Sequence, residues 1–386
     1  MATPGTGAPP SLPRLDEFAD RFRAWMAAHD AQLAPLLAPR SDCDQRIEQA
    51  RRLRGLLSQH GWGRYGWPES LGGLGGTIIH RGIVYEELFR VGWGGPSIFE
   101  HLEIIAPTLA NFAEPSFAAR VLPEFIDGSK AWSQGFSEPE AGSDLASLRT
   151  RAVPDGDEFV VTGQKIWTSW AKWADWCLAL VRTGTAEERH RGLTMIAIDL
   201  NSPGVDARPI TQANGTDELA EVAFDAVRVP RSQVVGEVGG GWTVAMFLLA
   251  HERGTLSWLK HCAFRQQLLA SAKSMSENHD RELGEIALQI AGVRAAAANL
   301  LWRAAAGKPL GPDSAFNKLL MTRTEQNLNN LLLDAEGMRI ALPGADEEEI
   351  LLQQEYLFSR IVTIYGGSQQ MQLITIARHV LGLPND

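Results

Sequence analysis

Hydrophobic residues follow a helical spacing over the first third of the chain. Between residues 12 and 130 they recur three or four positions apart, as in residues 15–25, which is typical of helices with one buried face. A glycine-rich segment, residues 61–76, breaks this pattern, and the next helix is predicted over about residues 78–90. We therefore predict a helical N-terminal domain at residues 12–130.

The pattern changes in residues 131–236. Short apolar runs of strand length, such as residues 193–198, are separated by turn sequences, among them Asp155-Gly156 and Asn214-Gly215. No helical run lies between these segments. Strands that follow one another at short intervals predict a middle domain built as an antiparallel β-barrel or sandwich.

Helical spacing returns in residues 237–386. Leu283 and Ile290 belong to one apolar stripe, which predicts helices packed against one another. The last helix is expected to begin after Ser368, which would cap its N-terminus, and to end at Gly382 as its C-cap. Residues 1–11 contain neither a basic residue nor an apolar run, so we predict a disordered leader there rather than a signal peptide.

Composition excludes several classes of function. The 386 residues carry a formal net charge of −10, which argues against a nucleic-acid-binding protein. No apolar run is long enough for a membrane span, so no membrane partner is predicted. The three cysteines are far apart, which predicts no disulfide framework and a reducing, cytoplasmic location. The nine histidines stand at no metal-ligand spacing, and no metal site is predicted.

Two segments of the middle domain are candidates for ligand binding. Residues 134–145 are rich in hydroxyl groups, small residues and accessible backbone N–H groups, which suit polar ring edges and phosphates. Residues 163–169 place an aromatic ring, Trp167, and a hydroxyl group, Ser169, on a strand, where they would face a flat cofactor. From the residues alone, an ordinary surface turn and a core tryptophan remain alternatives. The Gly61–Gly66 segment matches GxGxxG but follows a helical pattern, so we interpret it as a turn.

These two segments resemble the flavin signature of the acyl-CoA dehydrogenase family. Further matching motifs are Gly66-Trp67-Pro68-Glu69, Leu71-Gly72-Gly73, Leu122-Pro123, Val229-Pro230, Gly240-Gly241-Trp242 and Ile364-Tyr365-Gly366-Gly367-Ser368. The resemblance extends over residues 12–386. It implies an α+β multidomain fold with an N-terminal helical domain, a middle β domain and, at residues 237–386, a four-helix bundle.

The resemblance implies FAD as cofactor. The residues expected to bind it are Gln134, Phe136, Ser137, Gly142, Ser143, Trp167, Thr168, Ser169, Tyr365, Gly367, Ser368 and Gln370. Ser143, Arg253 and Gly366 are expected to contact the substrate, an acyl-CoA or an acyl-carrier thioester.

The catalytic base is expected at Glu252. The chemistry requires a carboxylate that removes the α-proton of the thioester while a hydride leaves the β-carbon. Most of the family places this Glu in a Tyr-Glu-Gly triplet, but this chain has Tyr365-Gly366-Gly367 there. A minority of the family places it in a Glu-Arg pair on the first long C-terminal helix, and here that pair is Glu252-Arg253. The alternative for Glu252 is an ordinary surface ion pair.

The function predicted from this resemblance is α,β-desaturation of an acyl-CoA, with electrons passed to an electron-transferring flavoprotein. A flavin oxidase or monooxygenase on the same fold and a subunit of a heteromeric acyl-CoA dehydrogenase are the alternatives. We expect a homodimer or homotetramer, or else a heteromer. The family's Arg-x-x-Phe-Gly segment, which binds the neighbouring subunit's flavin, lacks its Phe in residues 280–284. The Glu-Arg arrangement also resembles members that act on steroid or other bulky acyl-CoAs.

Overall fold

The structure is a computed structural model that describes residues 13–95, 99–273, 275–342, 344 and 346–384. The predicted leader, residues 1–11, lies outside the described residues. The first helices are α1 (Leu15–Ala28), α2 (Asp30–Leu37), α3 (Cys43–Gln59), α4 (Ile78–Arg90), α5 (Phe99–Phe112) and α6 (Pro115–Asp127). The Gly61–Gly66 segment forms a turn between α3 and α4: Gly61 adopts φ of 84°, and no strand precedes it among the described residues.

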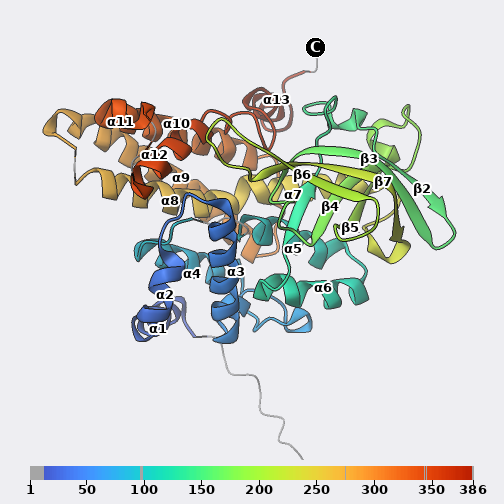
Figure 1. Ribbon diagram of the computed structural model, residues 1–386, viewed down its shortest axis with the longest axis horizontal. Coiled ribbons are helices and arrows are strands. Elements are labelled where there is room, and N and C mark those ends of the chain that lie inside the picture. The colour runs from blue at the N-terminus through green and yellow to red at the C-terminus, as the bar shows by residue number, and fades with distance from the viewer. Residues whose placement is uncertain (1–12, 96–98, 274, 343, 345, 385–386) are drawn as a thin grey trace, which may run out of the picture.

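A twisted sheet follows these helices and occupies one end of the molecule (Figure 1). Its strands are β1 (Trp132–Gly135), β2 (Arg151–Asp155), β3 (Glu158–Ser169), β4 (Trp176–Arg182), β5 (Leu193–Asp199), β6 (Val205–Ile210), β7 (Leu219–Pro230) and β8 (Val234–Val235). Their order is β6-β7-β3-β2-β4-β5-β8, with β1 also paired to β4.

The sheet departs from the prediction in one respect. Most neighbours are antiparallel, but β1 and β2 both run parallel to β4. Every residue of β4 is buried, since one side of the strand packs into the sheet core and the other against the helices. A strand covered on both faces reads as a continuous apolar run, so its neighbours' direction left no mark in the sequence.

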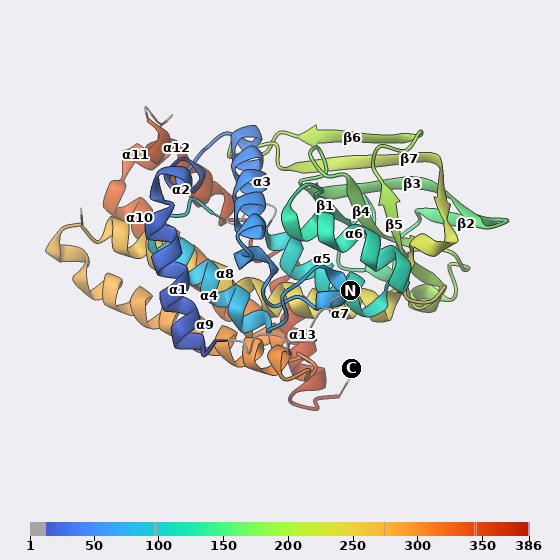
Figure 2. The ribbon, with the colours of Figure 1, turned by 90° about the horizontal axis from the view of Figure 1, so that it is seen from below.

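The remaining chain is helical. Its helices are α7 (Gly241–Gly254), α8 (Leu256–Ser271), α9 (Asp280–Ala305), α10 (Ser314–Glu336), α11 (Met338–Ala341), α12 (Glu347–Phe358) and α13 (Gln369–His379). Helices α7, α8, α9 and α10 pack against one another as the predicted bundle. Helix α7 also packs against β5 and α5, so it connects the bundle to the sheet. Figure 2 shows α1, α2 and α4 with the bundle helices α8, α9 and α10 on one side and the sheet, with α6 beside it, on the other.

The ends of α13 agree with the prediction only at the N-terminus. The Ser368 hydroxyl accepts a hydrogen bond from the Met371 backbone N–H at 3.3 Å, as an N-cap does. The helix ends at His379 rather than at Gly382. Gly382, with φ of 65°, lies beyond the end, where the Leu383 N–H turns back to the Ala377 carbonyl.

No helix in the described part of the chain is long and apolar enough to cross a membrane. All three cysteines are buried free thiols. The predicted domain boundaries, residues 130/131 and 236/237, stay predictions.

Candidate active site

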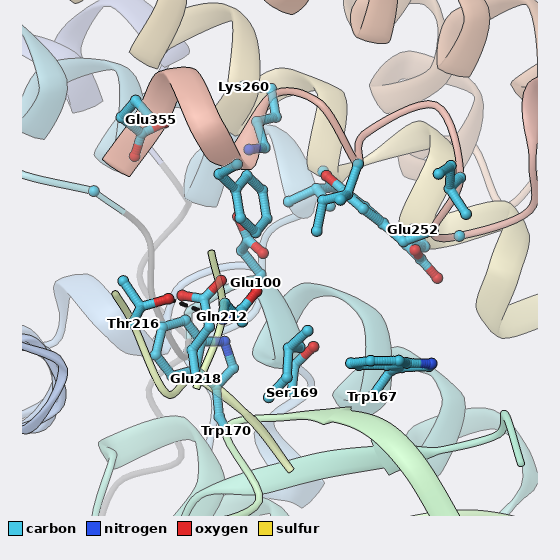
Figure 3. A pocket seen from close by; sticks show the side chains of 18 of the residues that line it. Glu100, Trp167, Ser169, Trp170, Gln212, Thr216, Glu218, Glu252, Lys260 and Glu355 are labelled. Carbon is cyan, nitrogen blue, oxygen red and sulfur yellow. Dashed lines mark hydrogen bonds between the residues drawn. The ribbon is translucent and has the colours of Figure 1, made fainter. Parts of the chain in front are cut away.

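A cavity of about 1830 Å³ opens between the sheet, α5, α7, α8 and the C-terminal segment. Figure 3 shows Glu252 on one wall and Trp167 and Ser169 on the facing wall. The predicted site residues that line it are Gln134, Phe136, Ser137, Gly142, Ser143, Trp167, Ser169, Glu252, Arg253, Tyr365, Gly366, Gly367 and Ser368. Residues more than 200 positions apart in the sequence therefore meet in one place.

Two predicted cofactor residues do not line the cavity. The Thr168 side chain is fully buried, and its hydroxyl has no hydrogen-bond partner among the described residues. Gln370 is exposed in the first turn of α13. Their contact with a cofactor stays a prediction.

Trp167 owes its orientation to a bulge in β3. The register between β3 and β7 shifts between Lys165 and Thr168, and Trp167 adopts φ of 59°. A positive φ is costly for a residue with a side chain and is often found at functional sites. The bulge leaves 55% of Trp167 exposed, although the indole stands on a rigid strand. A large aromatic face is thus held ready for a flat ligand.

The two ligand-binding segments are tied to each other by the backbone. The Ile166 N–H donates to the Ser137 carbonyl at 2.9 Å, so the loop after β1 lies against β3 beside Trp167. Ser143, further along the same loop, is exposed at the cavity wall.

A buried ion pair that the sequence analysis missed fixes this loop. Lys165 Nζ donates to Glu138 Oε1 at 2.7 Å and to the Phe136 carbonyl at 3.1 Å. The Glu138 carboxylate also accepts from the backbone N–H groups of Arg149, at 2.6 Å, and Thr150, at 2.9 Å. Burial alone would raise the pKa of Glu138, but Lys165 and these donors outweigh it and hold that pKa below its ordinary value.

Glu252 and Gly366 share one volume. Gly366 adopts φ of 63°, and a Cβ atom built on it would collide with Glu252 Oε1. The carboxylate of Glu252 therefore fills the space that a side chain at position 366 would take. Arg253 Nε donates to the Gly366 carbonyl at 3.2 Å, which ties this turn to the C-terminal end of α7.

Away from Glu252 and Trp167, the cavity wall becomes polar (Figure 3). Glu100, Glu218, Lys260 and Glu355 line this end. Gln212, also at this end, donates to the Thr216 hydroxyl at 2.8 Å. Burial raises the pKa of Glu100 to about 7, so this carboxyl is partly protonated near neutral pH. The wall near Glu252 is instead apolar, with Met246, Leu249 and Leu256 among its residues.

Comparison with known proteins identifies the family. Family models match residues 14–129, 133–227 and 239–381 as the N-terminal, middle and C-terminal domains of acyl-CoA dehydrogenases. The chain is 37% identical over 385 residues to the acyl-CoA dehydrogenase IpdE1 of Mycobacterium tuberculosis, which covers 96% of this chain and 98% of the relative. The chain belongs to the acyl-CoA dehydrogenase family.

Solved acyl-CoA dehydrogenase structures resemble this chain over almost its whole length. A variant of the Tcur3481-Tcur3483 steroid ACAD (acyl-CoA dehydrogenase) has a TM-score of 0.82 at 27% identity, over 96% of this chain and 99% of that one. The ChsE4-ChsE5 complex from Mycobacterium tuberculosis has a TM-score of 0.77 at 26% identity, over 97% and 99%. The predicted family, the α+β fold and the enzyme class, a flavoprotein oxidoreductase, are thereby confirmed.

Proposed function

We propose that this acyl-CoA dehydrogenase desaturates an acyl-CoA between its α- and β-carbons, with Glu252 as the catalytic base and FAD as the cofactor. The observation that carries the proposal is the shared volume of Glu252 and Gly366. By the family resemblance, position 366 is where most members hold the base. The carboxylate of Glu252 reaches the same volume from α7, so it is placed to remove the α-proton in the same way.

The cavity fits FAD. Trp167 offers an exposed aromatic face, Ser137 and Ser169 offer hydroxyl groups beside it, and Gly142 leaves open space around its backbone. The N-terminus of α13, capped by Ser368, adds backbone N–H groups that favour negative charge. FAD, when bound, supplies the acceptor for the hydride from the β-carbon.

Glu252 has the properties that proton abstraction requires. Glu252 lines the cavity, and its buried Oε2 atom accepts no hydrogen bond among the described residues, so no neighbouring donor there competes with the α-proton for the carboxylate. The hydrogen bond from Arg253 to the Gly366 carbonyl holds the backbone next to the base and so limits its movement. The apolar wall around Met246 and Leu249 would exclude water from the reacting carbons.

We further propose a bulky acyl group with an apolar body and a hydrogen-bonding end. The cavity volume of about 1830 Å³ and the polarity of its lining, apolar beside Glu252 and polar at Glu100 and Glu218, support this proposal. The likeness to a steroid ACAD supports it as well. We expect an electron-transferring flavoprotein as the electron acceptor.

The test is anaerobic flavin reduction with a panel of CoA thioesters that contains straight-chain, branched and steroid acyl groups. Reduction by a bulky acyl-CoA is expected, and the bleached flavin should persist in air until an electron-transferring flavoprotein is added. Fast reoxidation by air would instead identify an oxidase or monooxygenase. A protein that neither carries nor takes up FAD would be a non-catalytic subunit.

The base is tested by Glu252→Gln, which keeps the size and polarity of the side chain and removes the proton acceptor. FAD content should stay normal, and the rate of flavin reduction should fall about 10²–10⁴-fold. Glu285→Gln, an exposed substitution on α9, is the matched control and should leave the rate unchanged. A near-normal rate in Glu252→Gln would move the base to another residue.

A further inference from the structure

A buried lysine stands beside the proposed base. Lys318 on α10 is only 3% exposed. Its Nζ atom lies 4.0 Å from the centre of the Tyr365 ring and 3.5 Å from where a Cβ of residue 366 would be. That is the volume filled by the Glu252 carboxylate, so a cation and a carboxylate converge on one point.

The residue before Lys318 holds α10 in this position. Asn317 Nδ2 donates to the Arg253 carbonyl at 3.0 Å and also bonds the Ser257 hydroxyl. Both acceptors lie at the junction of α7 and α8, and Arg253 directly follows Glu252 in the chain. These hydrogen bonds hold the α10 backbone next to Lys318 against the end of α7 that carries Glu252.

Among the acids around this point, Glu252 acts most strongly on Lys318, through its charge rather than through a direct ion pair. Glu325, the other acid near Lys318, already pairs with Lys260 at 3.4 Å. Burial lowers the pKa of Lys318 to about 8, although Glu252 acts in the opposite direction. The charged and titratable groups around Lys318 are Glu252 and Arg253 on α7, Lys260 on α8, Glu325 on α10 itself and Tyr365 between α12 and α13.

We propose that Lys318 is a positioning residue for the base: its ammonium group stabilises the ionised carboxylate of Glu252 and holds it toward the α-carbon of the acyl chain. This inference rests on the proposed function of Glu252. A carboxylate in a desolvated site keeps its ionised form when an opposite charge or hydrogen-bond donors face it, and the Oε2 atom of Glu252 has no donor among the described residues. Lys318 supplies that charge from behind the base, on the side away from the substrate cavity, which it does not line.

Removal of the charge should change the pH dependence of flavin reduction. Without the ammonium group the ionised carboxylate is less stable, so a higher pH is needed to deprotonate the base. The acidic limb of the rate profile of Lys318→Met should therefore move to higher pH by about 1 unit or more. Lys318→Arg keeps the charge and should return the limb toward its original position.

The experiment measures anaerobic flavin reduction from mildly acidic to alkaline pH with the substrate found in the panel. Arg323→Met, which removes an exposed cation from the same helix, is the matched control and should leave the profile unchanged. An unmoved acidic limb in Lys318→Met, or the same shift in Lys318→Arg, would overturn the inference. In that case a loss of activity in Glu252→Gln would still support Glu252 as the catalytic base. The two proposals can therefore be rejected independently of each other.

A thermal measurement covers the case in which Lys318→Met does not fold. Glu252→Gln leaves the buried ammonium without its carboxylate and should lower Tm. The double variant Glu252→Gln with Lys318→Met removes both charges and should regain most of that loss. A double variant no more stable than Glu252→Gln would overturn the pairing.

Discussion

Trp167 combines an unfavourable backbone conformation with an exposed aromatic face. More than half of the side chain is uncovered, so a ligand that lay on the ring would bury apolar surface that is now exposed. Trp167→Ala is therefore expected to raise the Kd for FAD by about 10-fold. This factor corresponds to the free energy of one lost aromatic contact. Fluorescence titration of the apoprotein with FAD measures this.

Trp167→Phe, which keeps an aromatic ring at the same position, is the matched control and should retain most of the affinity. Unchanged affinity in Trp167→Ala would leave the tryptophan without a role in the flavin site.

Glu252 and position 366 allow a second experiment at the scale of single residues. Gly366→Glu alone should lower the rate of flavin reduction, because its side chain forces the Glu252 carboxylate out of its present position. Combined with Glu252→Gly, which vacates the volume, Gly366→Glu should regain part of the rate of flavin reduction. Recovery should be incomplete, since a residue with a side chain at φ of 63° costs about 1–2 kcal/mol.

The control for this pair is Glu252→Gly alone, which should be as inactive as Glu252→Gln. A double variant no faster than that control would mean that the two positions do not reach the same α-carbon.

At the scale of elements, the loop from Phe136 to Thr150 depends on one buried ion pair. Lys165→Met would leave the Glu138 carboxylate buried without its cation, which typically costs about 3–5 kcal/mol of unfolding free energy. FAD binding should weaken in parallel, because the loop beside Trp167 loses its anchor. Calorimetry and FAD titration measure the two effects. Arg149→Met, in an exposed ion pair with Glu140 on the same loop, is the control and should change stability little.

The same pair predicts a pH dependence. The pKa of Glu138 is lower in the folded protein than its ordinary value, so its stabilising contribution is complete above that ordinary value. The contribution is lost as the pH falls through the folded pKa. Wild-type Tm should therefore fall further on acidification than the Tm of Glu138→Gln. Parallel acid profiles for the two proteins would contradict this.

The elements differ in how far the sequence predicts them. Apolar spacing was sufficient for α1, α3 and α9, whose buried residues follow it, and Ser368 marked the start of α13. Apolar spacing could not predict that β1 and β2 pair in parallel with β4, because the order of strands depends on contacts between residues distant in the sequence. The same limit applies to the candidate site. Glu138 and Lys165 are 27 residues apart, and Lys318 meets Glu252 only through helix packing.

At the scale of the whole molecule, large apolar side chains remain exposed on α9. Leu288 is 75% exposed and Trp302 is 59% exposed, and their separation of about four helical turns places them on one face. Exposed apolar surface of this kind marks interaction sites. We expect an oligomer, either a homodimer or homotetramer or a heteromer, measured by light scattering of the FAD-loaded protein.

Leu288→Arg should shift the distribution toward smaller species, and Val153→Arg, an exposed substitution on β2, is not expected to do so. A monomer that still reduces its flavin with substrate would contradict the expectation of an oligomer.

The shared volume of Glu252 and Gly366 also restricts how this site arose. If the base of an ancestor stood at position 366, as the family resemblance implies, a second glutamate at position 252 could not hold its carboxylate in the present position while the first remained. No intermediate could carry both carboxylates in this geometry. On the proposed assignment, the carboxylate of Glu252 could therefore take its present position only once residue 366 had lost its side chain.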